Sequence, residues 1–84
     1  MKLLVVSIRD VKTDAFMQPF FTRTKPEAIR AFSDAINDPK SQFAQHPDDY
    51  SLYLLGEFDD SSGALVCADQ TDRLITGLEC VRKD

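Results

Sequence analysis

The chain has 84 residues, of which 43% are hydrophobic and 29% charged, and this length suits a single domain spanning residues 1–84. No apolar run approaches the roughly 18 residues of a membrane span, and the apolar start Met1–Ile8 lacks a signal-peptide cleavage site, so we expect no membrane segment and no secretion signal. The net charge of −4 argues against a strongly basic nucleic-acid-binding domain.

The first part of the chain is expected to form two strands. Lys2–Ile8 is rich in aliphatic and β-branched residues, which favours a buried strand. A polar connection at Arg9–Ala15 follows, and the aromatic-rich segment Phe16–Thr22 predicts a second strand. Because Pro19 has no N–H to donate, we expect this second strand to lie at an edge of the sheet or to contain a bulge.

The strongest local signal predicts a helix that begins after Thr24. Thr24 and Glu27 have the spacing of a capping box, and Pro26 suits the first turn of a helix. Asn37–Pro39 is expected to end the helix. The apolar residues between these limits recur with the helical period and define one face: Ala28, Ile29, Phe32, Ala35 and Ile36.

The second half of the chain is expected to add a short helical turn at Ser41–His46, anchored by Phe43, and then a hairpin. A turn at Asp59–Gly63 connects its two strands, Tyr50–Phe58 and Ala64–Ala68, and the tail from residue 69 is expected to be extended. Alternation along the first strand predicts an apolar face of Tyr50, Leu52, Leu54 and Phe58, and a mixed face of Ser51, Tyr53, Leu55 and Glu57. The order β-β-α-β-β predicts an α+β fold, a small antiparallel sheet with one main helix on one face.

No residue pattern points to catalysis, so we expect a protein that is not an enzyme and that uses no cofactor and no metal. His46 is a lone histidine beside a proline, and it lacks a recognisable nucleophile. The carboxylate pairs Asp48–Asp49 and Asp59–Asp60 are expected to serve as turn and capping residues, since they could hold a cation only if the fold made them converge. Cys67 and Cys80 are expected to be free thiols.

Charge and aromatic residues are unevenly distributed along the chain. Residues 1–30 hold six basic and three acidic residues, a balance of +3, whereas residues 31–84 hold four basic and eleven acidic residues, a balance of −7. Phe16–Lys25 interleaves aromatic rings with cations, a pattern that suits single-stranded nucleic acid. The stacking candidates are Phe16 and Phe20, which we expect on one face of a strand. The candidates for phosphate contacts are Arg9, Lys12, Arg23, Lys25 and Arg30.

Two further interpretations stay open at the level of the sequence. The rings could instead fill the core while the cations cap a sheet edge, and the uneven charge could be ordinary surface scatter. Self-association is also expected, because a sheet with a Pro-bearing edge and a mixed outer face containing Tyr53 and Leu55 suits pairing about a two-fold axis. We therefore expect a homodimer or a higher oligomer.

The chain resembles the small nonstructural protein of gokushovirus-type bacteriophages, the Microviridae with circular single-stranded DNA genomes. The most specific part of the resemblance is HPDDYSLYLLGEFDD, which lies within Gln45–Gly63. The other matching segments follow in order along most of the chain: MKLLVVSIRD at the start, the Pro19-Phe20-Phe21 step, AFSDAINDP at Ala31–Pro39 and ITGLEC at Ile75–Cys80.

The resemblance implies a nonstructural phage protein that acts in the host bacterial cytoplasm and is absent from the mature virion. It further implies a non-enzymatic role in the replication or packaging of single-stranded DNA, with direct DNA binding as one mode of action. The alternative is an adaptor that binds a phage or host replication or capsid protein, including a procapsid protein, without touching DNA. No catalytic residue is carried over by the resemblance.

Overall fold

The structure is a computed structural model and describes residues 1–82. Over this range one antiparallel sheet contains β1 (Lys2–Asp10), β2 (Ala15–Phe16), β3 (Phe20–Thr22), β4 (Tyr50–Asp59) and β5 (Leu65–Thr76). The helical segments are α1 (Lys25–Asn37), α2 (Gln42–Gln45), the 3-10 turn η1 (Pro47–Asp49) and α3 (Gly77–Cys80). The predicted α+β fold with one main helix is confirmed.

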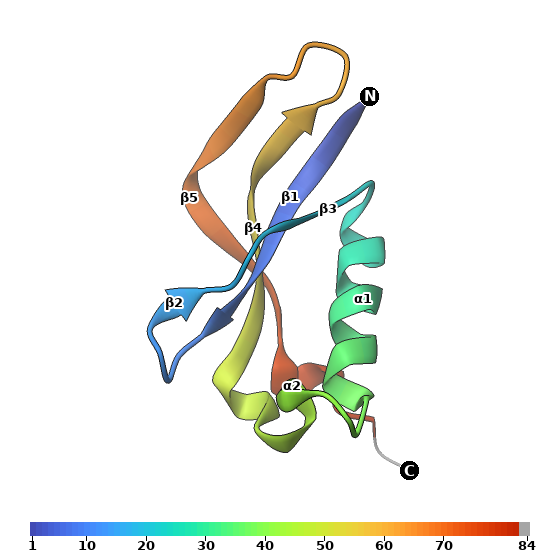
Figure 1. Cartoon of the computed structure of the whole chain (residues 1–84), viewed down its shortest axis with the longest axis vertical. Helices are drawn as coiled ribbons and strands as arrows, with labels where there is room; N and C mark the ends of the chain where they lie inside the picture. The colour runs from blue at the N-terminus through green and yellow to red at the C-terminus, as the bar shows by residue number, and fades with distance from the viewer. Residues whose placement is uncertain (83–84) are drawn as a thin grey trace.

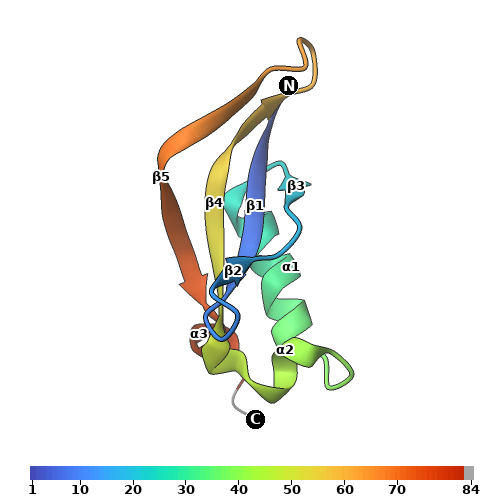
Figure 2. The same cartoon turned by 60° about the vertical axis from the view of Figure 1, so that its left-hand side comes forward.

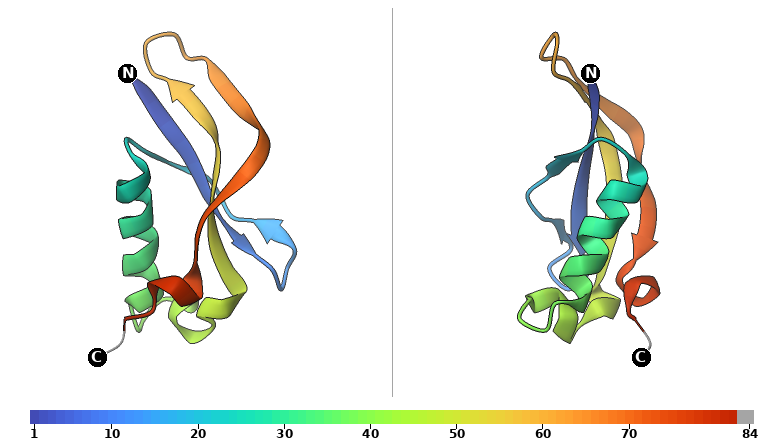
Figure 3. Two further views of the ribbon diagram at one scale, coloured as in Figure 1. Left: turned by 180° about the vertical axis from the view of Figure 1, so that it is seen from behind. Right: turned by 90° about the vertical axis from the view of Figure 1, so that its right-hand side faces the viewer.

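The strands follow the order β2-β1-β4-β5, and β3 pairs with β1 on the same side as β2. Helix α1 covers one face of the sheet, which we call the helix face, and the short helical segments gather at one end (Figures 1 and 2). The opposite face, which we call the outer face, carries no helix among residues 1–82 (Figure 3). At the other end, the β4–β5 hairpin extends beyond the start of α1 (Figure 1).

The core lies between α1 and the middle of the sheet. Phe32 of α1 is 1% exposed and packs with the fully buried Val6 and Leu52 of the two central strands. Ala28 and Ile36 are buried on the same face of α1, as the helical period predicts. Burial of this apolar stripe is the main source of the stability of such a small domain.

The helix termini confirm one predicted cap in part and reveal another. The Thr24 hydroxyl accepts a hydrogen bond from the Glu27 amide at 3.2 Å, which is one half of the predicted capping box. A complete box forms instead at the start of α3, where Thr76 and Glu79 bond each other's backbone amides. The Glu79 carboxylate also accepts a 2.9 Å hydrogen bond from the Thr76 hydroxyl, and this bond, with the one from the Thr76 amide, lowers the pKa of Glu79. The tail is extended as far as Thr76, as predicted, but Gly77–Cys80 is helical, which corrects the expectation there. The last two residues of the predicted tail, 83–84, lie outside the described range.

The prediction of one strand over Phe16–Thr22 is wrong in one respect, because this part of the chain forms two short strands, β2 and β3. Between them, the carbonyl of Met17 accepts a 2.6 Å hydrogen bond from the buried Ser7 hydroxyl. Pro19 cannot donate to the ladder, and it lies in this break at the edge of the sheet, as predicted.

The two faces predicted for β4 are also corrected. Val5 pairs with Gly56 while the next residue of β1, Val6, pairs with Leu54, so Leu55 is an extra residue in β4. Such a bulge reverses the alternation of all residues beyond it. Phe58, expected on the apolar helix face, therefore lies on the outer face.

Gly77 is required by a close approach of two backbones at the junction of α3 and η1. A Cβ atom there would overlap the carbonyl oxygen of Pro47 and lie 2.9 Å from its carbonyl carbon. We expect Gly77→Ala to lower the free energy of unfolding by about 2 kcal/mol or more, because neither backbone can swing aside.

Urea unfolding followed by circular dichroism measures this effect. Gly63→Ala is the matched control, because a Cβ at Gly63 has open space and only the positive φ of 77° opposes it. That variant should lose about 1 kcal/mol. Equal losses in the two variants would contradict the close approach at Gly77.

Candidate nucleic-acid interface

Four aromatic rings gather in two pairs on the outer face of the sheet. Phe16 meets Tyr53 edge to face, with ring centroids 5.4 Å apart and an interplanar angle of 85°. Phe21 meets Phe58 at 5.5 Å and 52°. Phe16 is 40% exposed and Phe21 is 52% exposed, so each pair presents a ring to solvent. We call these four residues the aromatic platform.

The strand register explains why the four rings share this face. Directly paired residues of antiparallel strands point to the same side of a sheet. Phe16 is paired with Arg9, Phe21 with Val5, Tyr53 with Ser7, and Phe58 with Leu3, and these four partners alternate along one side of β1. The bulge at Leu55 is essential, because without it Phe58 would point toward α1.

The Phe16 ring is accompanied by a cation. The Arg9 guanidinium lies 5.5 Å from the ring centroid, in cation–π range, and also pairs with the Asp14 carboxylate. Asp14 has a φ of 54° in the turn between β1 and β2, which brings its side chain back toward Arg9. Lys12 lies in the same turn and is exposed.

The structure divides the seven predicted site residues into three groups. Arg9, Lys12 and Phe16 lie together at the β1–β2 end of the outer face. Phe20 packs against the core on the helix face, on the opposite side of the sheet from Phe16, and lies outside the aromatic platform. The remaining three cations are exposed just before α1 or in its first two turns: Arg23, Lys25 and Arg30.

The prediction that Phe16 and Phe20 share a face fails because of one extra residue. Their partners Arg9 and Val6 are three residues apart in β1, whereas the two phenylalanines are four residues apart. The odd residue reverses the alternation, so Phe21 takes the exposed position instead. The signal that could have indicated this was Pro19, since a proline at an edge often accompanies a break in register.

An apolar groove lies beside the aromatic platform on the outer face. It runs from Pro19 at the edge of the sheet across β1 and the β4 bulge to β5, and its lining residues are Val5, Pro19, Leu55, Gly56, Leu65, Val66 and Cys67. Its lining offers hydrocarbon rather than hydrogen-bonding groups. Cys67 is exposed there as a free thiol, whereas burial raises the pKa of the Cys80 thiol in the core.

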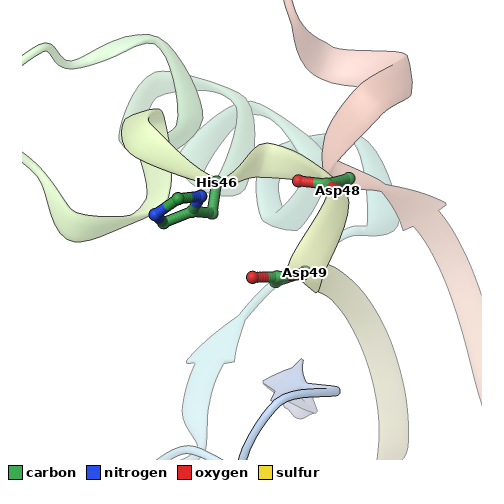
Figure 4. A group of neighbouring side chains, drawn as sticks. All are labelled: His46, Asp48 and Asp49. Carbon is green, nitrogen blue, oxygen red and sulfur yellow. The ribbon is translucent and has the colours of Figure 1, made fainter.

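The fold also brings together one histidine and two aspartates, side chains of the kinds that bind metal ions. Ligand atoms of His46, Asp48 and Asp49 lie within 4.8 Å of one another around η1 (Figure 4). The two carboxylates lie in the first turn of η1, a position that acidic residues favour in helices. His46 and Asp48 are exposed, so water competes for them, and the trio by itself does not define a metal centre.

No helix within the described 1–82 range is long and apolar enough to span a membrane. The fold and the surface thus define a small α+β protein with an aromatic, partly cationic sheet face. A family model described as "Phage ORF5 protein" matches residues 3–80, so the chain belongs to this family and is a phage protein. No curated protein and no solved structure matches it.

Proposed function

We propose that the protein binds single-stranded DNA on the aromatic platform and thereby assists replication or packaging of the phage genome, without catalysing a reaction. The observation that carries this proposal is the exposed Phe16 ring with the Arg9 guanidinium 5.5 Å from its centroid, on the same sheet face as a second exposed ring at Phe21. We further propose that the protein belongs to a gokushovirus-type phage of the Microviridae, acts in the host bacterial cytoplasm and is left out of the mature virion.

Unpaired bases suit this surface better than duplex DNA does. A base in a single strand has free π faces that can stack on Phe16 and Phe21, whereas the bases of a duplex are already stacked. Phosphates would be met by Arg9 and Lys12 at one end of the platform. At the other end, Arg23 follows the exposed Phe21 by two residues in the chain.

The direct test is fluorescence anisotropy of a labelled single-stranded oligonucleotide, with a duplex of the same sequence for comparison. Measurements at about 50 and 200 mM salt separate phosphate-driven binding from binding that salt barely affects. We expect salt-sensitive binding that prefers the single strand. Absence of binding at tens of micromolar protein, even at the lower salt concentration, would overturn the proposal.

The two cations that follow Phe21 closely in the chain provide a prediction about the path of the DNA strand. We expect Arg23→Ala together with Lys25→Ala to weaken binding and to reduce the slope of log K against log salt by about 1.4, because about 0.7 is lost for each phosphate contact to a single strand. The control removes Lys40 and Arg82 instead, an equal charge beyond the opposite end of α1. A slope unchanged by the first pair would remove Arg23 and Lys25 from the interface.

An adaptor function is the second candidate, and the apolar groove lined by Val5, Leu55 and Leu65 favours it. Hydrocarbon side chains recognise a protein surface better than a phosphate backbone, and the net charge of −4 adds repulsion toward nucleic acid. Capture of a phage replication or capsid protein that persists after nuclease treatment, combined with no binding in the anisotropy experiment, would favour the adaptor.

A further inference from the structure

Strand β5 has an open edge that the described part of the chain leaves unpaired. It pairs only with β4, and all residues from Leu65 to Arg73 are exposed (Figures 1 and 2). It also separates from β4 in its middle, because Cys67 pairs with Gly56 and the next pair along β5 joins Asp72 to Leu54. Only Leu55 of β4 therefore stands opposite residues 68–71.

An open edge of this length normally carries a feature that prevents pairing with another chain, such as a proline or an inward-pointing lysine. At 12 residues β5 is a long strand, and it contains neither proline nor lysine. Its irregular pairing with β4 at residues 68–71 is a bulge-like feature, and the charges beside it decide whether it blocks pairing or permits it. Its charged residues, Asp69, Asp72 and Arg73, have both signs.

We propose that β5 pairs antiparallel with β5 of a second copy, about a two-fold axis through Thr71. In this register Asp69 lies opposite Arg73 of the partner subunit, and the symmetry repeats that pair. Gln70 lies opposite Asp72 of the partner subunit, whose carboxylate accepts a hydrogen bond from the Gln70 amide. Thr71 lies opposite the partner subunit's Thr71, a favourable cross-strand pair.

The sequence of this segment, DQTDR, is thus complementary to itself at every position from Asp69 to Arg73. The register that places Asp72 opposite Arg73 of the partner subunit is poorer, because it sets polar Gln70 against Ile75 of the partner subunit. Cys67 pairs with Gly56 and Arg73 pairs with Tyr53, and both partners lie on the outer face. Alternation between Cys67 and Arg73 therefore places Asp69 and Thr71 on the outer face as well.

The proposed axis is perpendicular to the sheet, because the side chains of directly opposed residues in the two strands point to the same side of the sheet. The outer faces of the two copies then form one continuous surface, and both α1 helices lie on the other side. The two aromatic platforms then lie on this one surface. Their joint use by a single DNA strand rests on the proposed function, whereas the pairing of the two β5 strands does not.

The first test uses a disulfide at the axis. In a Cys67→Ser background, Thr71→Cys places two thiols on directly opposed residues, whose Cα atoms are about 4.5–5.5 Å apart, within disulfide range. We expect oxidised glutathione to convert this variant to a covalent dimer of the 9.5 kDa chain on a non-reducing gel. Ser62→Cys in the same background, in the exposed hairpin turn, controls for random collision. Cross-linking at residue 71 no faster than at residue 62 would overturn the proposal.

The second test reverses charges in the Thr71→Cys, Cys67→Ser background. Asp69→Arg alone and Arg73→Asp alone each create two like-charge pairs, and we expect each to slow cross-linking about tenfold. An equimolar mixture of the two variants restores both opposite-charge pairs, so heterodimers should dominate the products, as mass spectrometry can show. A mixture that cross-links as slowly as the separate variants would contradict the register. Because neither test contains DNA, a failure to dimerise is distinct from a failure to bind DNA.

Discussion

Replacing Phe32 with alanine is expected to lower the free energy of unfolding by about 3–5 kcal/mol, the range typical of buried phenylalanines. Phe32 is 1% exposed, and its ring fills the space between α1 and the central strands, against Val6 and Leu52. A domain of this size has a total stability on the order of 4–13 kcal/mol, so the loss is a large fraction of the whole.

Urea unfolding measured by circular dichroism checks this expectation, with Phe21→Ala as the matched control. The control removes the same atoms from a side chain that is 52% exposed on the outer face, and it should cost well under half as much. A control that destabilises the protein as strongly as Phe32→Ala would mean that the outer face is part of the core and is no free surface.

The largest effect on function is expected from removing both exposed rings of the aromatic platform. Phe16→Leu with Phe21→Leu keeps apolar side chains in the sheet and removes the flat π surfaces on which bases would stack. Because stacking contributes about 1–3 kcal/mol per base, we expect the affinity for single-stranded DNA to fall at least about tenfold. Anisotropy titrations at a fixed salt concentration measure the change.

The matched control is Phe16→Tyr with Phe21→Tyr, which retains both rings and should keep most of the affinity. Circular dichroism establishes that both double variants are folded. If the leucine variant binds single-stranded DNA as tightly as the unmodified protein does, the aromatic platform is not the DNA site, and the outer face would be better explained as a protein-docking surface.

Much of the fold could be predicted because its signals are local. The helical period from Ala28 to Ile36 determines which face of α1 is buried, and Thr24 and Pro26 define its start. Phe43 anchors the short helix α2 against Tyr50, with ring centroids 4.8 Å apart, as the sequence indicated. These features depend on residues a few positions apart in the chain.

The site could be predicted only in part, because its composition depends on strand register. Of the residues that the sequence offered for the site, Arg9 and Phe16 lie within cation–π range, and Lys12 lies in the adjoining β1–β2 turn. The alternation predicted Phe20 on the same face as Phe16 and Phe58 on the helix face. Each assignment is reversed by one extra residue, which lies between Phe16 and Phe20 in the first case and at Leu55 in the second. Alternation is lost at such a residue, and the composition of a strand does not reveal where the residue lies.

The sequence alone therefore determined the α+β class, the main helix with its buried face, and the restriction of Pro19 to an edge or a bulge, because periodicity, capping and the missing proline N–H act locally. Only the tertiary structure decided which rings meet on the outer face and that β5 leaves an open edge. Both outcomes depend on pairing between strands far apart in the chain, where one bulge changes the face of every residue beyond it.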